Sequence, residues 1–487
     1  MLKNHRFRLR RPAARAAEAM GPARCGRPED SQTSLIGVAA LSWPIALGLL
    51  GDATMGLVDA RLVGHLGPAA LGGVGLGLTL MFLFYAGIFG LMRGVKVRTA
   101  FAVGQGSPED GRRYALAGVV VGCLLGVVVF AVGRQIGWAF RLLGAGPNLA
   151  EHGAEFFSAV SCGAPAAFVT AALVQHRQGL GDTRTPMIIG VAGNLVNAIL
   201  AYALIGGHLG FPAYGVAGAG FATAVTQGCQ AAGLLVVLFR DREGQPSRLD
   251  LRQAAREVGE LGLPTGVHFV AETLAFTAFA AIIGSLGELE MAAHQVALSV
   301  LRVSLLPGVA VGEAASVLVG QTLGRGELRG ADRVTQAAVR LAVGFMAFCA
   351  VLFVVFGHDM AGLFTTDQRV VDSATQLLWV AAGFQVLDAI NIVFRGALRG
   401  AKDVRMTAYL GTAIVWTCVP TAAFFLGRQL GWGALGGWCG FVLETTLASI
   451  IFTFRWRRGG WRSEYSRPLD VPSGLCDDRL ASTLCTR

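Results

Sequence analysis

Charged residues are scarce in this sequence, and lysine is the scarcest of them. Only 15% of the 487 residues are charged, against about 25% in an average soluble protein. Lysine occurs only at Lys3, Lys96 and Lys402, and no GxxxxGK[ST] motif is present. We infer that the chain does not hydrolyse ATP and that water is not its main solvent.

Closely spaced cysteines are absent as well. The nine cysteines stand singly between Cys25 and Cys485 without CxxC spacing, and several lie inside apolar stretches. We interpret them as small packing residues and not as disulfides or metal ligands. We expect no removable signal peptide, because the basic N-terminal tail has no apolar segment before Leu35.

Long apolar stretches dominate what is present. A stretch of roughly 20 residues crosses a hydrocarbon core of about 30 Å as a helix, and the 67 glycines let helices pack closely in a bilayer. The sequence therefore predicts an all-α membrane protein with twelve transmembrane helices. Their expected positions are 35–59, 69–92, 114–138, 151–174, 185–206, 214–239, 258–284, 289–318, 334–357, 370–394, 405–427 and 433–455.

Basic residues gather in alternate loops between these stretches. They fill the N-terminal tail, the expected loop from Arg93 to Arg113 and the 240–256 linker, and they recur from Arg395 to Arg405. By the positive-inside rule, both termini are expected to be cytoplasmic and the protein to lie in the inner membrane. This alternation also argues against nucleic acid as the partner of a chain with a formal net charge of +10.

The two halves of the chain resemble each other at an offset of 220 residues. Six helices is an even number, so the second half enters the membrane in the same direction as the first, which predicts two parallel six-helix repeats. Transporters of this design hold substrate between two bundles and expose it to alternate sides by rocking. The matching pairs include Pro44 with Pro264, Gly64 with Gly284, Gly67 with Gly287, Gly104 with Gly324, and Gly106 with Gly326.

This repeat divides the chain into five segments. We expect the first bundle to be followed by a charged interfacial linker, and disordered cytoplasmic tails at both ends. The segments are a basic tail 1–33, a first six-helix bundle 34–239, a cytoplasmic linker 240–257, a second six-helix bundle 258–458 and a tail 459–487.

Six acidic residues stand in or at the ends of apolar stretches, where a carboxylate costs several kcal/mol. Structural pairing with Arg302 is one explanation for Glu313 and Glu444. For the others we favour a role in ion coupling or substrate binding. The six are Asp52, Asp59, Glu272, Glu313, Asp388 and Glu444.

Acids recur at related positions of the two halves. Asp52 and Asp59 are seven residues apart and share one face of the first helix. The repeat offset places Asp52 in register with Glu272, so each half holds an acid eight residues after the proline of its first helix. Acids that face a central cavity of low polarity switch readily between a charged form and a protonated or cation-bound form.

At these residues the chain resembles the multidrug and toxic compound extrusion family, over residues 35–458. Gly56-Leu57-Val58-Asp59 resembles the family's first helix and its essential acid. Ala292-Ala293-His294-Gln295 and Val319-Gly320-Gln321 resemble its eighth helix. Glu272 and Asp388 are similar to the cation site of its sodium-coupled bacterial branch.

The resemblance implies a secondary antiporter and not an enzyme. We expect it to export small, cationic or amphipathic organic compounds in exchange for Na+ or H+ by rocker-switch alternating access. Glu272 and Asp388 are the candidate Na+ site, and Asp59 is the candidate coupling acid of the first half. We expect a monomer in the lipid bilayer that needs no cofactor besides the coupling ion.

Three positions depart from the family pattern. Archaeal and related members carry a second acid one turn after the fifth-helix asparagine, whereas here Asn197 is followed by Ala201. Asn197 and Thr223 are then the expected polar neighbours of Asp59. Asp52 is an additional charge at a place that is usually neutral, and Glu313 matches no family position.

Other functions fit the sequence less well. A lipid-linked precursor flippase of the same superfamily needs a cationic cavity for pyrophosphate, and few arginines are expected inside the membrane. An embedded enzyme needs paired catalytic groups at one depth, which the sequence does not clearly offer. Gly179-Leu180-Gly181-Asp182 matches the GxGD of intramembrane proteases, but Arg184 and Pro186 place Asp182 in a loop.

Overall fold

The structure is a computed structural model in which every regular element of the described residues is helical, as the sequence predicts. Our expectations for the tail 1–33, for most of the linker 240–257 and for the end of the tail 459–487 fall outside the described residues. The described ranges are 34–142, 146–241 and 250–464.

The first half of the chain forms the helices α2 to α9. Of these, α6 and α7 are together long and apolar enough for one span, and they are bent by 56° at the break between them. The bend follows from Pro165 in the first turn of α7, because proline cannot donate a hydrogen bond to the preceding turn. The bounds are α2 (Leu35–Gly64), α3 (Pro68–Gly104), α4 (Pro108–Gly133), α5 (Gly137–Leu142), α6 (Pro147–Ser161), α7 (Ala164–Leu180), α8 (Arg184–Gly206) and α9 (Gly215–Arg240).

The second half forms the helices α10 to α15. In the described residues, eleven helices are long and apolar enough to cross a membrane, and the bent pair raises the number to twelve, which confirms the predicted count. The bounds are α10 (Leu251–Gly284), α11 (Glu288–Gly324), α12 (Leu328–Gly362), α13 (Gln368–Gly400), α14 (Val404–Ala422), its π-helical continuation η1 (Ala423–Gln429), α15 (Gly433–Arg458) and η2 (Gly460–Glu464).

Turns at equivalent places of the two halves have similar backbone conformations. Gly67 and Gly287 precede α3 and α11 with φ values of 108° and 145°. Gly106 and Gly326 follow the same two helices with φ values of 80° and 79°. Residues with a Cβ atom adopt such angles at a cost. The sequence repeat is therefore also a repeat of backbone structure.

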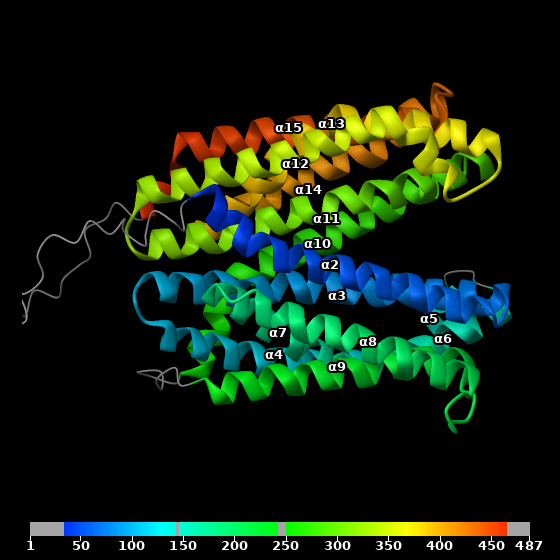
Figure 1. The fold of residues 1–487 in the computed structure, drawn as a ribbon, viewed down its shortest axis with the longest axis horizontal. Helices are drawn as coiled ribbons and strands as arrows, with labels where there is room; N and C mark the ends of the chain where they lie inside the picture. Colours follow the sequence, from blue (N-terminus) through cyan, green and yellow to red (C-terminus); the bar gives the residue numbers. More distant parts are fainter. Residues whose placement is uncertain (1–33, 143–145, 242–249, 465–487) are drawn as a thin grey trace, which may run out of the picture.

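The helices form two groups, as Figure 1 shows: α3 to α9 lie on one side and α10 to α15 on the other. Helix α2 runs obliquely between them. It begins against α11 and α12 and then packs along α8. We call α2–α9 the first bundle and α10–η2 the second bundle. The end of the molecule where α2 begins and α15 ends is called the terminal end.

The two bundles contact each other in their terminal halves. One apolar core joins Val38 and Ala100 of the first bundle to residues of α11 and α12. Another joins Met92 of α3 to Val258 of α10. The cores of the opposite halves each draw on one bundle alone. The terminal half therefore holds the bundles together.

Glycines bring the two bundles into backbone contact there. A methyl group added at Gly90 of α3 would lie 2.5 Å from the Cα atom of Gly266 in α10. One added at Gly104 would lie 2.8 Å from the Cα atom of its repeat partner Gly324. Such spacing leaves no room for a side chain, and it gives extensive dispersion contacts between helices that have little hydrophobic drive to associate in lipid.

Charged segments that we assigned to loops are in fact helical. Arg93 and Lys96 lie in α3, and Arg395 and Arg399 lie in α13. Helix α10 begins at Leu251, before the expected position 258. With 37 residues, α3 is about 55 Å long at 1.5 Å per residue, so it extends beyond a hydrocarbon core of about 30 Å. The charges in these extended ends are paired inside the protein.

Candidate functional site

Asp59 lies in α2, away from the terminal end, and its carboxylate is incompletely hydrogen-bonded. The Oδ1 atom is buried and accepts no hydrogen bond from the described residues. Helices α2 and α8 run in the same direction, and Asn194 of α8 contacts Asp52 seven residues earlier. The same shift along both helices brings Asp59 level with Ala201. An alanine at that position offers Asp59 no polar partner.

Asp52 does have a partner in the same bundle. The Asn194 side chain donates a hydrogen bond from Nδ2 to Asp52 Oδ1 at 3.2 Å. The close approach of α2 and α8 at this level is visible at Gly51, where an added methyl group would lie 3.1 Å from the Asn194 amide nitrogen. The two acids of α2 therefore differ: Asp52 accepts from an amide, and Asp59 has one oxygen without a donor.

Asn197 and Thr223 bond to each other. Asn197 donates from Nδ2 to Thr223 Oγ1 at 3.4 Å, and the Thr223 hydroxyl donates to the carbonyl of Ala219 at 3.1 Å. The Oδ1 atom of Asn197 is buried without a donor. Within the described residues no hydrogen bond joins either side chain to Asp59. Asp59 and Asn197 thus each have one buried acceptor oxygen without a donor in the described residues.

Glu272 of α10 forms an ion pair with Arg395 of α13. Nη1 of Arg395 lies 3.1 Å from Glu272 Oε1 and 3.3 Å from Nε2 of His268. The other ring nitrogen of His268 lies 3.0 Å from the hydroxyl of Thr412. Arg395 therefore compensates the first of the two acids that the sequence assigned to a cation site.

Asp388 of α13 has amide side chains on both sides. Asn391 donates from Nδ2 to Asp388 Oδ1 at 3.3 Å, and Gln385 donates from Nε2 to Ser304 at 2.7 Å. Both amides leave a buried carbonyl oxygen without a donor. Gln385, Asp388 and Asn391 are spaced by three residues, so they share one face of the helix. The sequence analysis did not identify Gln385 and Asn391, although their three-residue spacing from Asp388 is visible in the sequence.

Glu444 of α15 belongs to the same cluster. It interacts electrostatically with Asp388, Arg395 and Glu272. The expected structural pairing of Glu444 with Arg302 is wrong, because Arg302 forms no ion pair within the described residues. The second bundle therefore gathers three acids around one arginine.

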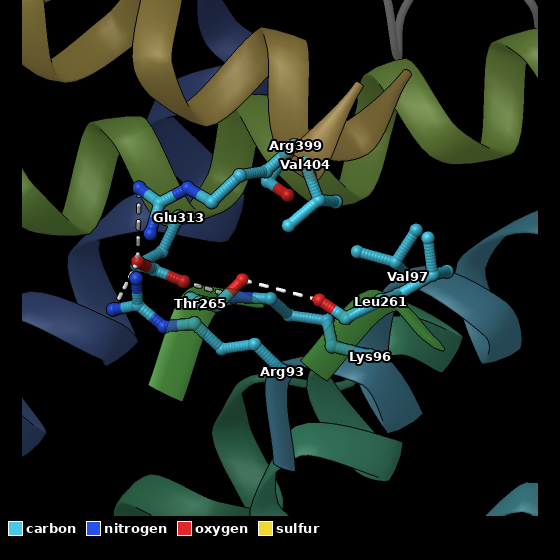
Figure 2. A pocket seen from close by; sticks show the side chains of 9 residues that line it. Arg93, Lys96, Val97, Leu261, Thr265, Glu313, Arg399 and Val404 are labelled. Carbon is cyan, nitrogen blue, oxygen red and sulfur yellow. Dashed lines mark hydrogen bonds and ion pairs between the residues drawn. The ribbon is translucent and has the colours of Figure 1, made fainter. Parts of the chain in front are cut away.

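Glu313 of α11 is paired with three other cations, which also contradicts the expected pairing with Arg302. Figure 2 shows Arg93, Lys96 and Arg399 converging on its carboxylate. Arg93 Nη2 lies 2.6 Å from Oε1, Arg399 Nη2 lies 3.8 Å from the same oxygen, and Lys96 pairs with Oε2. Arg302 is eleven residues earlier on the same helix, about 16 Å away along the axis, so it is too distant.

Asp182, the aspartate of the GxGD sequence, lies in the loop between α7 and α8. Burial alone would raise its pKa, but hydrogen bonds from Thr185 and the nearby Arg177 guanidinium hold the pKa below its ordinary value. Its repeat counterpart Asp403 is likewise paired, with Arg455 at 2.7 Å. Both aspartates are loop anchors, as their sequence context indicates.

Oxygen atoms of the kind that hard cations bind are present at and beside Asp388. In the described part of the chain, no three His, Cys, Asp or Glu residues are arranged to hold a metal ion. The set of Asp388, Gln385 and Asn391 is different, because it combines a carboxylate with two buried amide oxygens that lack donors. Hard cations take carboxylate and amide oxygens as ligands, so these three residues carry oxygen atoms of a suitable type.

Comparison with known proteins gives one family. The MatE family profile matches the chain twice, over residues 44–203 and 264–423. These two segments begin 220 residues apart, which is the offset of the internal repeat. The family therefore describes each half of the chain separately.

Curated relatives extend over most of the chain. A probable multidrug resistance protein NorM from Xanthomonas campestris is 32% identical over 425 residues, which cover 86% of this chain and 93% of that protein. The multidrug resistance protein PmpM from Pseudomonas aeruginosa is 30% identical over 436 residues, which cover 87% of this chain and 91% of that protein.

Solved structures share the fold. A multidrug resistance MATE family transporter of the MOP superfamily, in an outward-facing conformation, superposes with a TM-score of 0.81 at 20% identity, over 91% of this chain and all of that one. The eukaryotic MATE transporter AtDTX14 gives a TM-score of 0.78 at 18% identity, over 90% of this chain and 97% of that one. At such identities the likeness concerns the arrangement of helices.

Proposed function

Because this chain belongs to the MatE family of multidrug efflux transporters, which are not enzymes, we propose that it is a secondary antiporter. It exports small, cationic or amphipathic organic compounds in exchange for Na+ or H+. The exchange proceeds by rocker-switch movement of the two bundles. No group besides the coupling ion is required, and the working unit is a monomer in the bilayer.

One observation supports this proposal: each bundle holds an acid within an apolar helix that is long enough to cross a membrane, and each holds buried oxygens that lack donors. In the first bundle they include Oδ1 of Asp59 and of Asn197, and in the second they include the amide oxygens of Gln385 and Asn391. A buried acceptor without a donor is costly. A proton or a cation satisfies such acceptors, so both sites favour reversible ion capture.

The second bundle is the better candidate for Na+. Asp388, Gln385 and Asn391 supply oxygens from one face of α13, whereas Glu272 lies beside them with its charge compensated by Arg395. A cation captured at Asp388 adds positive charge to this cluster. It therefore changes how strongly Arg395 is attracted to the acids around it. Asp59, with no cationic partner within the described residues, is suited to protons or to cationic substrate.

The packing of the bundles supports alternating access. They share apolar cores in the terminal half, and each has a core of its own in the opposite half. Two rigid bodies joined at one end are able to rock about their contact, which exposes the region between them to one side at a time. We propose that the terminal end is cytoplasmic, as the basic residues indicate.

This orientation predicts the result of single-cysteine labelling. On a background without the nine native cysteines, Phe211→Cys, in the loop after α8, should react with an impermeant maleimide in intact cells. Gln105→Cys, in the loop after α3, should react only after the cells are opened. Both side chains are exposed, so reactivity reports the side of the membrane. The reverse pattern would invert the topology.

Transport itself is tested in proteoliposomes with imposed gradients. A cationic fluorescent dye should accumulate against its own gradient when a Na+ gradient or a pH gradient is applied, and the gradient that drives it identifies the ion. Dissipating that gradient with an ionophore should stop accumulation. Uphill movement that depends on neither gradient would contradict antiport.

A flippase for lipid-linked precursors remains the second candidate because four cations, Arg93, Lys96, Arg395 and Arg399, lie inside the helices. These cations are already paired with Glu313 and Glu272, so a pyrophosphate would have to compete with two carboxylates for them. Movement of a pyrophosphate-linked lipid across the bilayer, without dye transport, would favour the flippase.

A further inference from the structure

The Glu313 cluster spans both bundles. Glu313 is buried, with 6% of its surface exposed. It lies in α11 of the second bundle, whereas Arg93 and Lys96 come from α3 of the first bundle and Arg399 comes from α13 of the second. The carboxylate therefore has two partners across the interface and one on its own side (Figure 2).

The internal repeat explains why these groups meet. Glu313 and Arg93 are separated by the repeat offset of 220 residues, so they occupy equivalent positions in α11 and α3. Their side chains lie 2.6 Å apart. Gly104 and Gly324, another equivalent pair, also face each other. Equivalent residues meet where the axis that relates the two halves passes through the interface.

Opposite charges at this axis attract the two bundles to each other. Two equivalent residues with like charge would repel each other and separate the bundles. The chain has an arginine in one half and a glutamate in the other, which attract each other and draw α3 onto α11. Lys96 adds a second attraction; its side chain is 2% exposed, so its charge depends on the Glu313 carboxylate.

The same cluster allows the contact to open. When α3 moves away from α11, Glu313 keeps Arg399 as a partner, because both belong to the second bundle. Arg93 and Lys96 lose their partner but gain water at the terminal end. Neither side is then left with an uncompensated buried charge, which is the costly outcome when a buried pair is broken.

We propose that Glu313 is an ionic latch between the two bundles, which closes the terminal end by binding Arg93 and Lys96 and so sets the balance between the two facing states of the transporter. The proposal rests on the rocking movement described under the proposed function. It gives Glu313 a positioning role in transport that is distinct from the ion sites at Asp59 and Asp388.

Neighbouring contacts strengthen the latch without replacing it. Gln321 of α11 donates from Nε2 to the carbonyl of Gly179 at 3.0 Å, and Arg98 of α3 lies 3.5 Å from Glu257 of α10. The Gln321 contact is buried and uncharged. The Arg98–Glu257 pair has side chains that are 21% and 19% exposed, and water weakens exposed ion pairs. The Glu313 carboxylate and the Lys96 side chain are more buried than this pair, with 8% and 2% of their side chains exposed.

Spin-label distances measure the latch directly. On the full-length, cysteine-free protein, labels at Gln105→Cys and Arg329→Cys report the separation of the bundles at the terminal end. Labels at Phe211→Cys and Leu363→Cys report the opposite end. All four native side chains are exposed, so the labels leave the interface intact. In Glu313→Gln, the population with a separated terminal end should rise about tenfold, while the opposite end closes.

Matched variants separate a latch from a general stabilising role. Asp332→Asn removes an ion pair with Arg462, 2.8 Å away and inside the second bundle, and should leave both distance distributions unchanged. Lys96→Met should shift them in the same direction as Glu313→Gln, and the double variant should shift them little further, because residues of one network act non-additively. Should Glu313→Gln fail to fold, Lys96→Met and Glu313→Asp give the same test.

Two results would overturn the latch. One is an unchanged terminal-end distance in folded Glu313→Gln and Lys96→Met. The other is an equal shift in Asp332→Asn. The distances are measured without substrate or ion gradient, so a failure of antiport in proteoliposomes refutes the proposed function and leaves the latch measurement valid. A normal antiport with no distance change refutes the latch alone.

Discussion

Asp59→Asn should abolish ion-driven uphill export while the protein keeps its fold and part of its substrate binding. One charge that crosses 100 mV gains about 2.3 kcal/mol, enough to concentrate a substrate about 50-fold. Wild-type protein should approach such a ratio in proteoliposomes. The variant should equilibrate the substrate and give a ratio of about one.

The reason lies in the environment of the carboxylate. Its Oδ1 atom is buried without a donor in the described residues. Ala201, seven residues after the Asp52 partner Asn194, is expected at the level of Asp59 in α8. An ion shifts a conformational equilibrium only when it binds the two conformations unequally. Asp59 offers a charge that a proton or cation removes, and this change favours one facing state and releases cationic substrate. Asparagine is neutral in both states, so the coupling is lost.

Substrate affinity measured across pH and sodium concentration isolates this role. The substrate affinity of the wild type should depend on pH or on sodium concentration. The substrate affinity of Asp59→Asn should depend on neither pH nor sodium concentration. Glu151→Gln, an exposed acid in α6 of the same bundle, is the matched control and should behave as wild type. If the substrate affinity of Asp59→Asn responded to the ion as fully as that of the wild type, Asp59 would have no role in coupling.

Glu272→Gln and Asp388→Asn should each abolish ion-driven transport, and the double variant should be hardly worse than either one. The two acids interact within one cluster that also holds Arg395 and Glu444, and residues that act as a unit give strongly non-additive losses. Initial rates of dye uptake in proteoliposomes measure this. Losses that multiply in the double variant would separate the two acids into independent sites.

A second variant distinguishes ion coupling from structural pairing at Glu272. Glu272→Gln removes the acid that lies 3.1 Å from Arg395 and leaves the arginine with Asp388 and Glu444. Breaking a buried pair with no other partner costs about 3–5 kcal/mol, so the loss of stability should be at most of this size. Glu272→Gln/Arg395→Met removes both charges and should recover thermal stability but not sodium-dependent uptake. Glu288→Gln, an exposed acid at the start of α11, should leave both unchanged. Recovery of uptake together with stability would assign Glu272 a structural role.

The candidate site was only partly predictable from the sequence. The positions of Asp59, Glu272 and Asp388 were identified because acids are rare in apolar stretches and therefore conspicuous. Their partners were not identified, since partners come from other helices. Glu313 and Arg302 are close in the sequence but about 16 Å apart along the helix, whereas Glu313 and Lys96 are 217 positions apart and in contact.

The sequence by itself determined the class of protein, the twelve spans, the repeat and the membrane-embedded acids, because these depend on the length of apolar runs and on local composition. Only the tertiary structure decided which charges neutralise one another, that Arg93 and Lys96 are helical and enclosed, and that the bundles contact at the terminal end. Ion pairing depends on the rotation and depth of each helix relative to its neighbours. Glycines such as Gly90 and Gly266 set that geometry through backbone contact, and no local pattern encodes it.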